Sequence, residues 1–518
     1  MIIITSAAYV DTELENEFGK LPPAFLPVGN KKLLELQLKE IRNYFKDEEV
    51  LLSLPQSFSN FNSFIDSLKD SGVILSYLDE NLSLKDSVLQ ILDNVEESPS
   101  SLRILHGDTF INFSKNSLLE VDVIGVSKTY EQYRWEFDKG EYVWNGFFSY
   151  SNCDFLKVCL RSSKNFVEAV KKYNENISLS RVKCDNWYDF GHINTYFKSR
   201  CKFTTQRHFN DLNINNGIVY KSSKNINKIK SETLWFLNIP NELKVYTPQL
   251  IDFSLNENDT FYKIEYLTLA PLNEMYVHGL KGEVFWRSVF YKFREWFKLS
   301  QSQVKDKYNK GIESHFRDLV QKKTQQRISC YDECLVEEFF KPFYYDGILV
   351  PSLDTVISDC IKESVRGGTY PGVLHGDLCF SNVLINSRAD QLKFIDPRGD
   401  SLEGAVGVFG DIRYDLAKLS HSVIGYYDHI LSKNFKINKI KLGNDYSYNI
   451  DFDLIENSNI VNSFINFDFI EDYETVDILP LTALLFISMV PLHNDSIAKQ
   501  RAFILNAVRI WILYKRLK

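Results

Sequence analysis

Residues 374–382 have the sequence Leu-His-Gly-Asp-Leu-Cys-Phe-Ser-Asn, and residues 393–399 have the sequence Lys-Phe-Ile-Asp-Pro-Arg-Gly. This part of the chain is the most informative about fold and chemistry. It places Asn382 five residues after Asp377, and an apolar run then ends in a second acid, Asp396. Phosphoryl transfer needs metal ions that neutralise the phosphates and a carboxylate that orients and deprotonates the attacking hydroxyl. We therefore predict Asp377 as the catalytic base and Asn382 and Asp396 as ligands of Mg²⁺.

This stretch resembles the catalytic loop of the aminoglycoside phosphotransferase and choline kinase group, which are small-molecule kinases with a protein-kinase-like fold. We expect His375 in that loop to act through hydrogen bonds rather than by transferring a proton. Residues 410–418, Gly-Asp-Ile-Arg-Tyr-Asp-Leu-Ala-Lys, look like the helix that supports the loop from behind in that group. The resemblance implies a two-lobed α+β domain that uses ATP to phosphorylate a small hydroxyl compound.

The residues that would position ATP should lie upstream of this loop. Lys221 ends a predicted strand, and Glu232 follows eleven residues later on a predicted helix. This order suits an ion pair that positions the lysine on the α- and β-phosphates. Lys228 and Lys230 are alternatives to Lys221.

A hinge for adenine is predicted at Glu265 to Leu267, directly after a predicted strand at 261–266. No G-x-G-x-x-G motif covers the phosphates, which departs from protein kinases. Gly404, Gly407 and Gly410 follow the catalytic motif and precede no βαβ unit, so a flexible loop is predicted there rather than a dinucleotide site. No G-x-x-x-x-G-K-[ST] motif occurs, which excludes a P-loop kinase.

Residues 1 to about 200 alternate short apolar runs with stretches of helical periodicity, which predicts an α/β domain with a mostly parallel sheet. The predicted strands are 2–5, 50–54, 72–77, 102–105 and 121–126, and the predicted helices are 32–44, 61–71, 84–94 and 154–172. Near residue 205 the pattern changes to a hairpin around Asn215-Asn216-Gly217, a helix at 226–237, and then a mainly helical chain after about 280.

Four segments of this first half resemble a sugar-phosphate nucleotidyltransferase. They are LPPAFLPVGNK at 21–31, LHGD at 105–108, NGFF at 145–148 and WYDFGH at 187–192. The resemblance implies that Asp108 and Asp189 hold one Mg²⁺ for an in-line attack on the α-phosphate of CTP or another nucleoside triphosphate.

Two departures leave the activity of this domain open. Its first loop continues from Ala8 as Tyr-Val-Asp-Thr-Glu rather than as a glycine-rich segment with an arginine, and Pro23 stands where the family has a lysine. Lys20 or Lys31 could replace that missing cation. Otherwise the domain would bind a nucleotide or sugar without turning it over.

The chain of 518 residues is thus predicted to form a nucleotidyltransferase-like domain at 1–203 and a kinase-like domain at 204–518. Within the second, residues 204–270 are predicted as the small ATP lobe and residues 271–518 as the helical lobe. The order of a small antiparallel sheet followed by helices is that of a two-lobed kinase.

Composition argues against several classes of partner. The net charge of −8 gives no global basic field for nucleic acid. Eight cysteines without a C-x-x-C pair are typical of reduced thiols in a cytosolic protein. The apolar run 478–492 is shorter than the roughly 20 residues that span a bilayer. A cytoplasmic protein without membrane insertion is therefore predicted, and its oligomeric state stays open.

Together these motifs predict a bifunctional enzyme. Its kinase would phosphorylate a sugar, an alditol, choline or another amino alcohol, and its N-terminal domain would couple that phosphate to a nucleotide, giving an activated donor for capsule or other surface polysaccharide. The alternative is a kinase alone, with a non-catalytic N-terminal binding module. An antibiotic or protein kinase is a third hypothesis, although a resistance enzyme would have little use for 200 additional residues.

Overall fold

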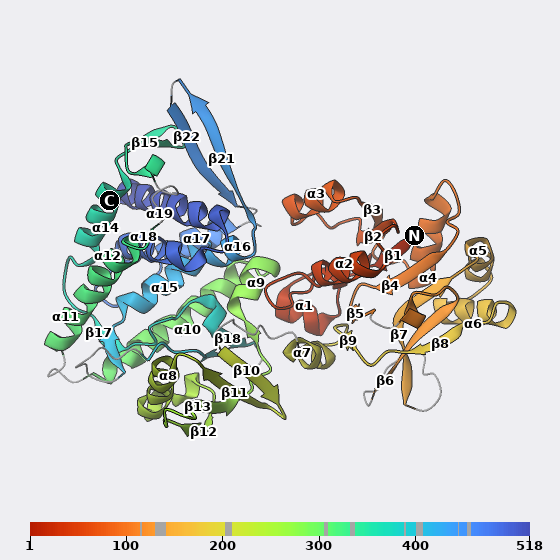
Figure 1. Cartoon of the computed structure of the whole chain (residues 1–518), viewed down its shortest axis with the longest axis horizontal. Coiled ribbons are helices and arrows are strands. Elements are labelled where there is room, and N and C mark those ends of the chain that lie inside the picture. Colours follow the sequence, from red (N-terminus) through yellow and green to blue (C-terminus); the bar gives the residue numbers. More distant parts are fainter. Residues whose placement is uncertain are drawn as a thin grey trace. The chain divides into compact units, whose positions relative to one another are not determined.

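The computed structural model describes residues 1–113, 116–129, 141–202, 210–304, 309–331, 337–387, 390–399, 408–443, 445–452 and 457–518. The chain divides into two compact units, residues 1–204 with 278–280, and residues 205–277 with 281–518. The boundary predicted near residue 203 and the loop at Gly404 and Gly407 lie outside the described residues. The elements of both units are labelled in Figure 1.

The first unit is built on a seven-stranded sheet of order β3-β2-β1-β4-β7-β6-β8. Its strands are β1 (Ile2–Thr5), β2 (Val50–Pro55), β3 (Val73–Leu78), β4 (Leu102–His106), β6 (Val123–Lys128), β7 (Tyr142–Tyr150) and β8 (Ser180–Lys183). All neighbours pair in parallel except β7, which runs antiparallel to both β4 and β6. The predicted α/β class with a mostly parallel sheet is confirmed.

Helices cover this sheet. They are α1 (Thr12–Phe18), α2 (Leu33–Tyr44), α3 (Asn62–Asp70), α4 (Leu84–Asn94), α5 (Cys153–Arg161), α6 (Phe166–Asn176) and α7 (Ile193–Cys201). Side chains of α4, α5 and α6 share one hydrophobic core with Ile3 of β1. Its neighbours Ile2 and Ile4 are buried as well, and since successive side chains point to opposite faces, both faces of β1 are covered.

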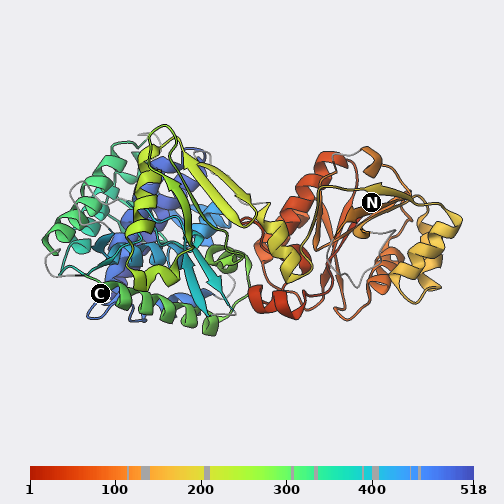
Figure 2. The same ribbon diagram turned by 90° about the horizontal axis from the view of Figure 1, so that it is seen from below.

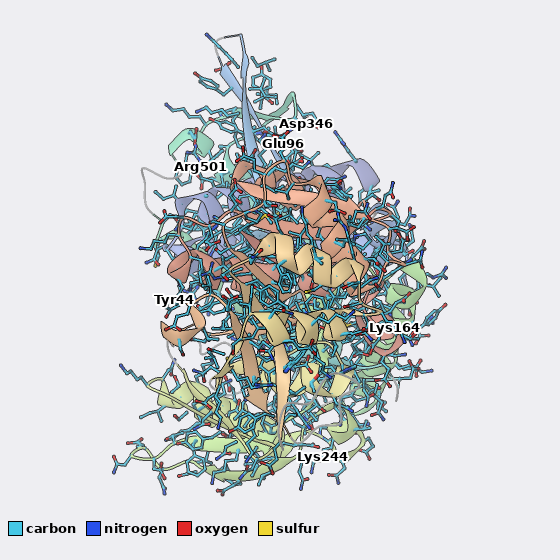
Figure 3. The ribbon with its side chains drawn as sticks, turned by 90° about the vertical axis from the view of Figure 1, so that its right-hand side faces the viewer. Tyr44, Glu96, Lys164, Lys244, Asp346 and Arg501 are labelled. Atoms are coloured by element: carbon cyan, nitrogen blue, oxygen red, sulfur yellow. The ribbon has the colours of Figure 1, made fainter. Side chains whose placement is uncertain are left out.

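The single helix predicted at 154–172 is wrong, because the chain breaks into α5 and α6. Asn165 caps α6 by accepting a hydrogen bond from the backbone N–H of Glu168, so a new helix begins there. Lys164, labelled in Figure 3, lies in the break. The polar run Ser-Ser-Lys-Asn at 162–165 was the signal for this break.

The second unit begins with a four-stranded antiparallel sheet of order β10-β11-β13-β12. Its strands are β10 (Asn210–Asn215), β11 (Ile218–Ser223), β12 (Leu250–Ser254) and β13 (Phe261–Glu265), and α8 (Ile226–Asn238) packs against them (Figure 2, residues in yellow-green). The predicted hairpin is confirmed: Asn216 and Gly217 form its two-residue turn with φ of 49° and 76°. Asn-Gly supplies the positive φ that such a turn requires. The sequence predicts the first strand of this hairpin at 207–213, of which residues 207–209 lie outside the described part.

The rest of this unit is mainly helical, as predicted. Its longer helices are α10 (Glu283–Ser302), α11 (Asn309–Val320), α14 (Leu353–Ser364), α15 (Arg413–Val423), α18 (Leu479–Met489) and α19 (Ile497–Leu517). The prediction missed a sheet of order β16-β15-β22-β21, formed by β15 (Phe343–Tyr345), β16 (Ile348–Val350), β21 (Phe435–Leu442) and β22 (Asp445–Phe452).

One segment of the described chain, Thr475–His493, is long and apolar enough to cross a membrane. It is 67% buried inside the protein, and its central helix α18 packs against α14, α15 and α19. The core helix of a globular unit has the same composition. The described cysteines are free thiols.

Candidate active site

The catalytic-loop motif forms the turn between two short strands of the second unit. It runs from β17 (Pro371–Val373) to β18 (Val383–Asn386), which pairs with β19 (Gln391–Phe394). The backbone N–H of Ile395 donates to the carbonyl of Asn382 at 3.0 Å. This hairpin therefore holds Asn382 beside the segment that carries Asp396.

Asp377 is held as a charged carboxylate. Asn382 Nδ2 donates to its carbonyl at 2.9 Å and to its Oδ2 at 3.2 Å, and Lys418 Nζ lies 2.9 Å from its Oδ1. Burial opposes ionisation, but the cations of Lys418 and Arg398 outweigh it and hold the pKa of Asp377 well below its usual range. Such a carboxylate can accept a hydrogen bond from a hydroxyl at any ordinary pH.

His375 is fully buried and holds the loop together. Its Nδ1 accepts from the backbone N–H of Asp377 at 3.3 Å, and its Nε2 lies 3.1 Å from the carbonyl of Ile395. This pattern assigns the proton to Nε2. Burial lowers the pKa of His375 to about 4, so the ring is neutral and acts by positioning.

Asp415 of α15 supports the loop from behind. Its two carboxylate oxygens accept the backbone N–H groups of His375 and Gly376 at 2.7 and 2.8 Å. Burial raises the pKa of Asp415 to about 7 against the effect of these two bonds. The segment 410–418 thus contacts the loop in the way its resemblance implied.

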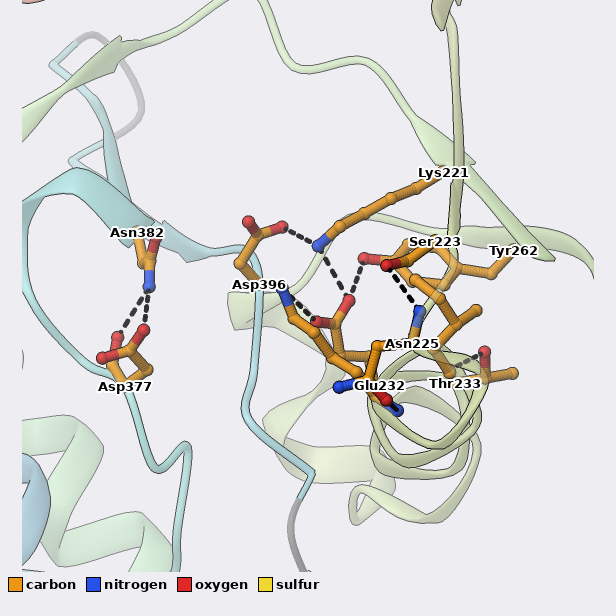
Figure 4. A network of polar contacts seen from close by, with 11 residues as sticks. Lys221, Ser223, Asn225, Glu232, Thr233, Tyr262, Asp377, Asn382 and Asp396 are labelled. Carbon is orange, nitrogen blue, oxygen red and sulfur yellow. Dashed lines mark hydrogen bonds and ion pairs between the residues drawn. The ribbon is translucent and has the colours of Figure 1, made fainter. Parts of the chain in front are cut away.

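Lys221 connects three distant segments (Figure 4). Its Nζ lies 2.8 Å from Glu232 Oε2 on α8 and 2.9 Å from Asp396 Oδ1. Tyr262 OH donates to the same Glu232 oxygen at 2.8 Å. Burial works against the charge on Lys221, but Asp396 and Glu232 raise its pKa above the usual value. The rival Lys228 lies 3.6 Å from the other oxygen of Glu232 and is exposed.

The segment that carries Asp396 is fixed against α8. Asp396 has a φ of 55°, a left-handed conformation that is costly for a residue with a Cβ and is typical of functional sites. Three residues on, Gly399 has a φ of 60°, and a Cβ there would lie 2.0 Å from the carbonyl oxygen of Ser231. Only glycine fits between this segment and α8.

The residues present fit a magnesium ion that also binds nucleotide phosphates. The amide nitrogen of Asn382 donates to Asp377, so the side-chain carbonyl oxygen of Asn382 points away from Asp377. Asp396 supplies a partly exposed carboxylate. Mg²⁺ is usually held by one or two such side chains together with substrate phosphates. In the described residues no group of three His, Cys, Asp or Glu could hold a metal ion by itself.

The predicted hinge lies where the small sheet ends. Glu265 is the last residue of β13, and its backbone N–H bonds to the carbonyl of Gln249. Tyr266 donates its N–H to Gly217 at 2.8 Å, and Leu267 follows. The role of Glu265 and Leu267 in binding adenine stays a prediction.

In the first unit, the carboxylates of Asp108 and Asp189 both lie close to Gly191. The short strands β5 (Thr109–Ile111) and β9 (Trp187–Asp189) pair antiparallel and bring the two carboxylates together. A Cβ on Gly191 would lie 2.5 Å from Asp108 Oδ2 and 3.2 Å from Asp189 Oδ1. Burial raises the pKa of Asp108.

The two candidate replacement lysines differ in position. Lys20 Nζ lies 4.2 Å from the centre of the Tyr9 ring, so it stacks on the first loop. Lys31 is exposed near the start of α2. Pro23 begins a short 3₁₀ helix, and the next residue, Ala24, donates its N–H to Ser6 Oγ at 3.0 Å. Lys20 therefore contacts the first loop, and which lysine replaces the missing cation stays a prediction.

Sequence reasoning missed Lys418. The motif around it was identified, but the ion pair with Asp377 depends on how α15 packs on the loop. Its spacing of three residues from Asp415 was a usable signal, because residues three apart share a face of a helix.

No family model matches the chain, and no curated protein matches it. Among solved structures, a nucleoside-diphosphate-sugar pyrophosphorylase from Vibrio cholerae RC9 is 13% identical, with a TM-score of 0.32, over 39% of this chain and 100% of that one. A UDP-glucose pyrophosphorylase complexed with UDP-glucose is 11% identical, with a TM-score of 0.31, over 39% and 97%. The inositol-1-phosphate CTP transferase of T. maritima is 14% identical, with a TM-score of 0.30, over 39% and 95%. Values this low carry no conclusion about activity, which depends on this chain's own residues.

Proposed function

We propose that residues 205–518 form a kinase with a protein-kinase-like fold that transfers the γ-phosphoryl group of ATP to a hydroxyl of a small molecule. The observation that carries the proposal is Lys221, whose ammonium bridges Glu232 on α8 and Asp396 after β19. A lysine held by a helix glutamate beside a metal-binding aspartate is the arrangement by which kinases position ATP. Asp377 and Asn382 lie on the neighbouring loop, bonded to each other.

In this reaction the acceptor hydroxyl oxygen attacks the γ-phosphorus while the bond from that phosphorus to the β–γ bridging oxygen breaks. ADP leaves, and the hydroxyl proton passes to the carboxylate of Asp377. Lys221 orients the α- and β-phosphates, and His375 and Asp415 keep the loop in place. Asn382 and Asp396 would hold Mg²⁺, which neutralises charge on the phosphates.

We further propose that the first unit transfers a nucleotidyl group to the phosphate monoester so formed. A monoester oxygen would attack the α-phosphorus of CTP or another nucleoside triphosphate, and pyrophosphate would leave. Two carboxylates that converge on Gly191 support a site for the required metal ion. The product would be an activated donor for surface polysaccharide, made in the cytoplasm.

The first test is phosphorus NMR of the protein with Mg²⁺, ATP, CTP and a pool of sugars, alditols, amino alcohols and hydroxy acids. A monoester and ADP, followed by pyrophosphate and a nucleotide diester, are expected. The Asp377→Asn variant should give neither product while remaining folded. Phosphorylation by that variant would overturn the kinase assignment.

One observation favours the alternative, in which the first unit binds without catalysis. Its first loop presents Tyr9 and Lys20 rather than a glycine-rich cradle for phosphates. A monoester that accumulates in the NMR experiment with every nucleotide supplied would support this alternative.

A further inference from the structure

Positive side chains gather beside the catalytic carboxylate. Lys418 pairs with Asp377, and Lys323 of helix α12 (Lys322–Ile328) donates to Tyr414 OH at 3.1 Å. Arg398 donates its backbone N–H to the carbonyl of His375. It also lies against Gly376, because a Cβ added to that glycine would lie 2.9 Å from the Cβ of Arg398. The group therefore combines α12, α15 and the segment after β19.

The carboxylates of Asp377 and Asp415 are engaged by other groups and do not pair with Lys323. Asp377 pairs with Lys418, and both oxygens of Asp415 accept backbone N–H groups. Within the described residues no carboxylate lies within ion-pair distance of Lys323, whose hydrogen bond goes to the neutral hydroxyl of Tyr414. An ammonium group without a counterion is costly at a partly buried site.

The positive charge of this group shifts the pKa values of Lys323 and of Tyr414. Although burial acts in the opposite direction, Lys323, Lys418 and Arg398 lower the pKa of Tyr414 to about 8. Burial, together with Arg398 and Lys418, lowers the pKa of Lys323. An oxyanion beside Lys323 would relieve this repulsion.

The spacing of residues along α15 indicates which molecule would carry such an oxyanion. Tyr414 and Lys418 are four residues apart on α15, so they share one face of the helix, about 6 Å apart along its axis. Asp377 contacts Lys418 at one end of this row, and Lys323 contacts Tyr414 at the other. A small molecule with its hydroxyl at Asp377 would place a group a few bonds away near Lys323.

We propose that the phosphoryl acceptor carries an anionic group, a carboxylate or a phosphate, which Lys323 and Tyr414 bind while its hydroxyl lies at Asp377. Lys323 is then a specificity residue of the acceptor site. The proposal depends on the kinase function proposed above. It favours a hydroxy acid or a sugar phosphate over the neutral and cationic acceptors among the hypotheses from sequence.

The test compares glycerol with D-glycerate and glycerol 1-phosphate as acceptors, using radiolabelled ATP and the whole protein. The two anions should have a kcat/KM at least tenfold higher than that of glycerol, and the better anion identifies the group. In Lys323→Met the ratio of anion to glycerol should fall about tenfold, mostly through KM, and Lys323→Arg should restore part of it. Lys322→Met is the matched control, since Lys322 is exposed and pairs with Asp318, and it should keep the wild-type ratio.

A second measurement separates the two proposals. D-glycerate and glycerol 1-phosphate should raise the pKa of Tyr414, read as phenolate absorbance in the wild type minus Tyr414→Phe, and this shift should vanish in Lys323→Met. Such a shift in a protein that phosphorylates nothing would support the anion site and refute the kinase. Phosphorylation of glycerol with no preference for either anion, or an equal loss of kcat for all three acceptors in Lys323→Met, would overturn the anion site and leave the kinase standing.

Discussion

Lys418 Nζ lies 2.9 Å from Asp377 Oδ1, which ties helix α15 to the carboxylate proposed as the catalytic base. This pair links the charge state of the base to one lysine. Since the pKa of Asp377 is held low chiefly by Lys418, against the effect of burial, the carboxylate stays charged far into the acid range.

Lys418→Met should therefore move the acid limb of the kcat/KM profile for phosphorylation upward by about one pH unit or more. A carboxylate whose pKa is lowered by folding stabilises the protein above its unfolded pKa, and this contribution is lost as pH falls through the folded value. The variant should thus also unfold more easily at pH 7. Lys499→Met, which removes the ion pair between α19 and Asp495, is the control, and an unchanged acid limb in Lys418→Met would contradict the prediction.

Lys221→Met should abolish ATP-dependent phosphorylation and destabilise the second unit. The side chains of Lys221 and Glu232 are each 2% exposed, so the variant leaves a buried carboxylate without its closest cation. Breaking a buried pair in this way costs about 3–5 kcal/mol, measurable by urea unfolding.

Lys228→Met distinguishes the two candidate lysines. The Lys228 side chain is 40% exposed and lies 3.6 Å from Glu232 Oε1, so its loss should change stability by about 1 kcal/mol or less and leave phosphorylation near the wild-type rate. A larger effect of Lys228→Met than of Lys221→Met would reverse the assignment.

Gly399→Ala tests the fit between the segment after Asp396 and α8. Its new Cβ would lie 2.0 Å from the carbonyl oxygen of Ser231 at a φ of 60°, so either Asp396 or the helix must move. We expect phosphorylation to fall at least tenfold, with a lower Tm. Gly368→Ala, where no atom lies within 4 Å of the added Cβ, should be neutral in both measurements.

Local signals predicted much of the fold. The Asn216-Gly217 turn was readable because the geometry it requires is set by two residues. The strand pair β21 and β22 was missed because the sequence FKINKIKL at 435–442 mixes lysines with apolar residues on an exposed hairpin and shows no clear buried face. The antiparallel strand β7 was missed because the motif NGFF at 145–148 was interpreted for its chemistry and not for its secondary structure.

The candidate site likewise contains residues that local sequence signals predicted and residues that only tertiary packing brings together. Asp377, Asn382 and Asp396 lie within one short stretch, so their spacing was visible in the sequence. The contact of Lys323 with Tyr414 joins α12 to α15 and arises only from tertiary packing. A lysine on a helix without a motif gives no local sign that it belongs to a site.

Gly191→Ala tests the first unit without changing any charge. The added Cβ would lie 2.5 Å from Asp108 Oδ2 and 3.2 Å from Asp189 Oδ1, so it should push apart the carboxylates proposed to share Mg²⁺. If this unit is catalytic, Gly191→Ala and Asp108→Asn should both lose pyrophosphate release while ATP-dependent phosphorylation continues. Asp93→Asn, which weakens only surface ion pairs with Arg161 and Lys157, should keep both activities. Pyrophosphate release at the wild-type rate in Asp108→Asn would assign nucleotidyl transfer to other residues, because a metal site with one carboxylate removed cannot hold its ion equally well.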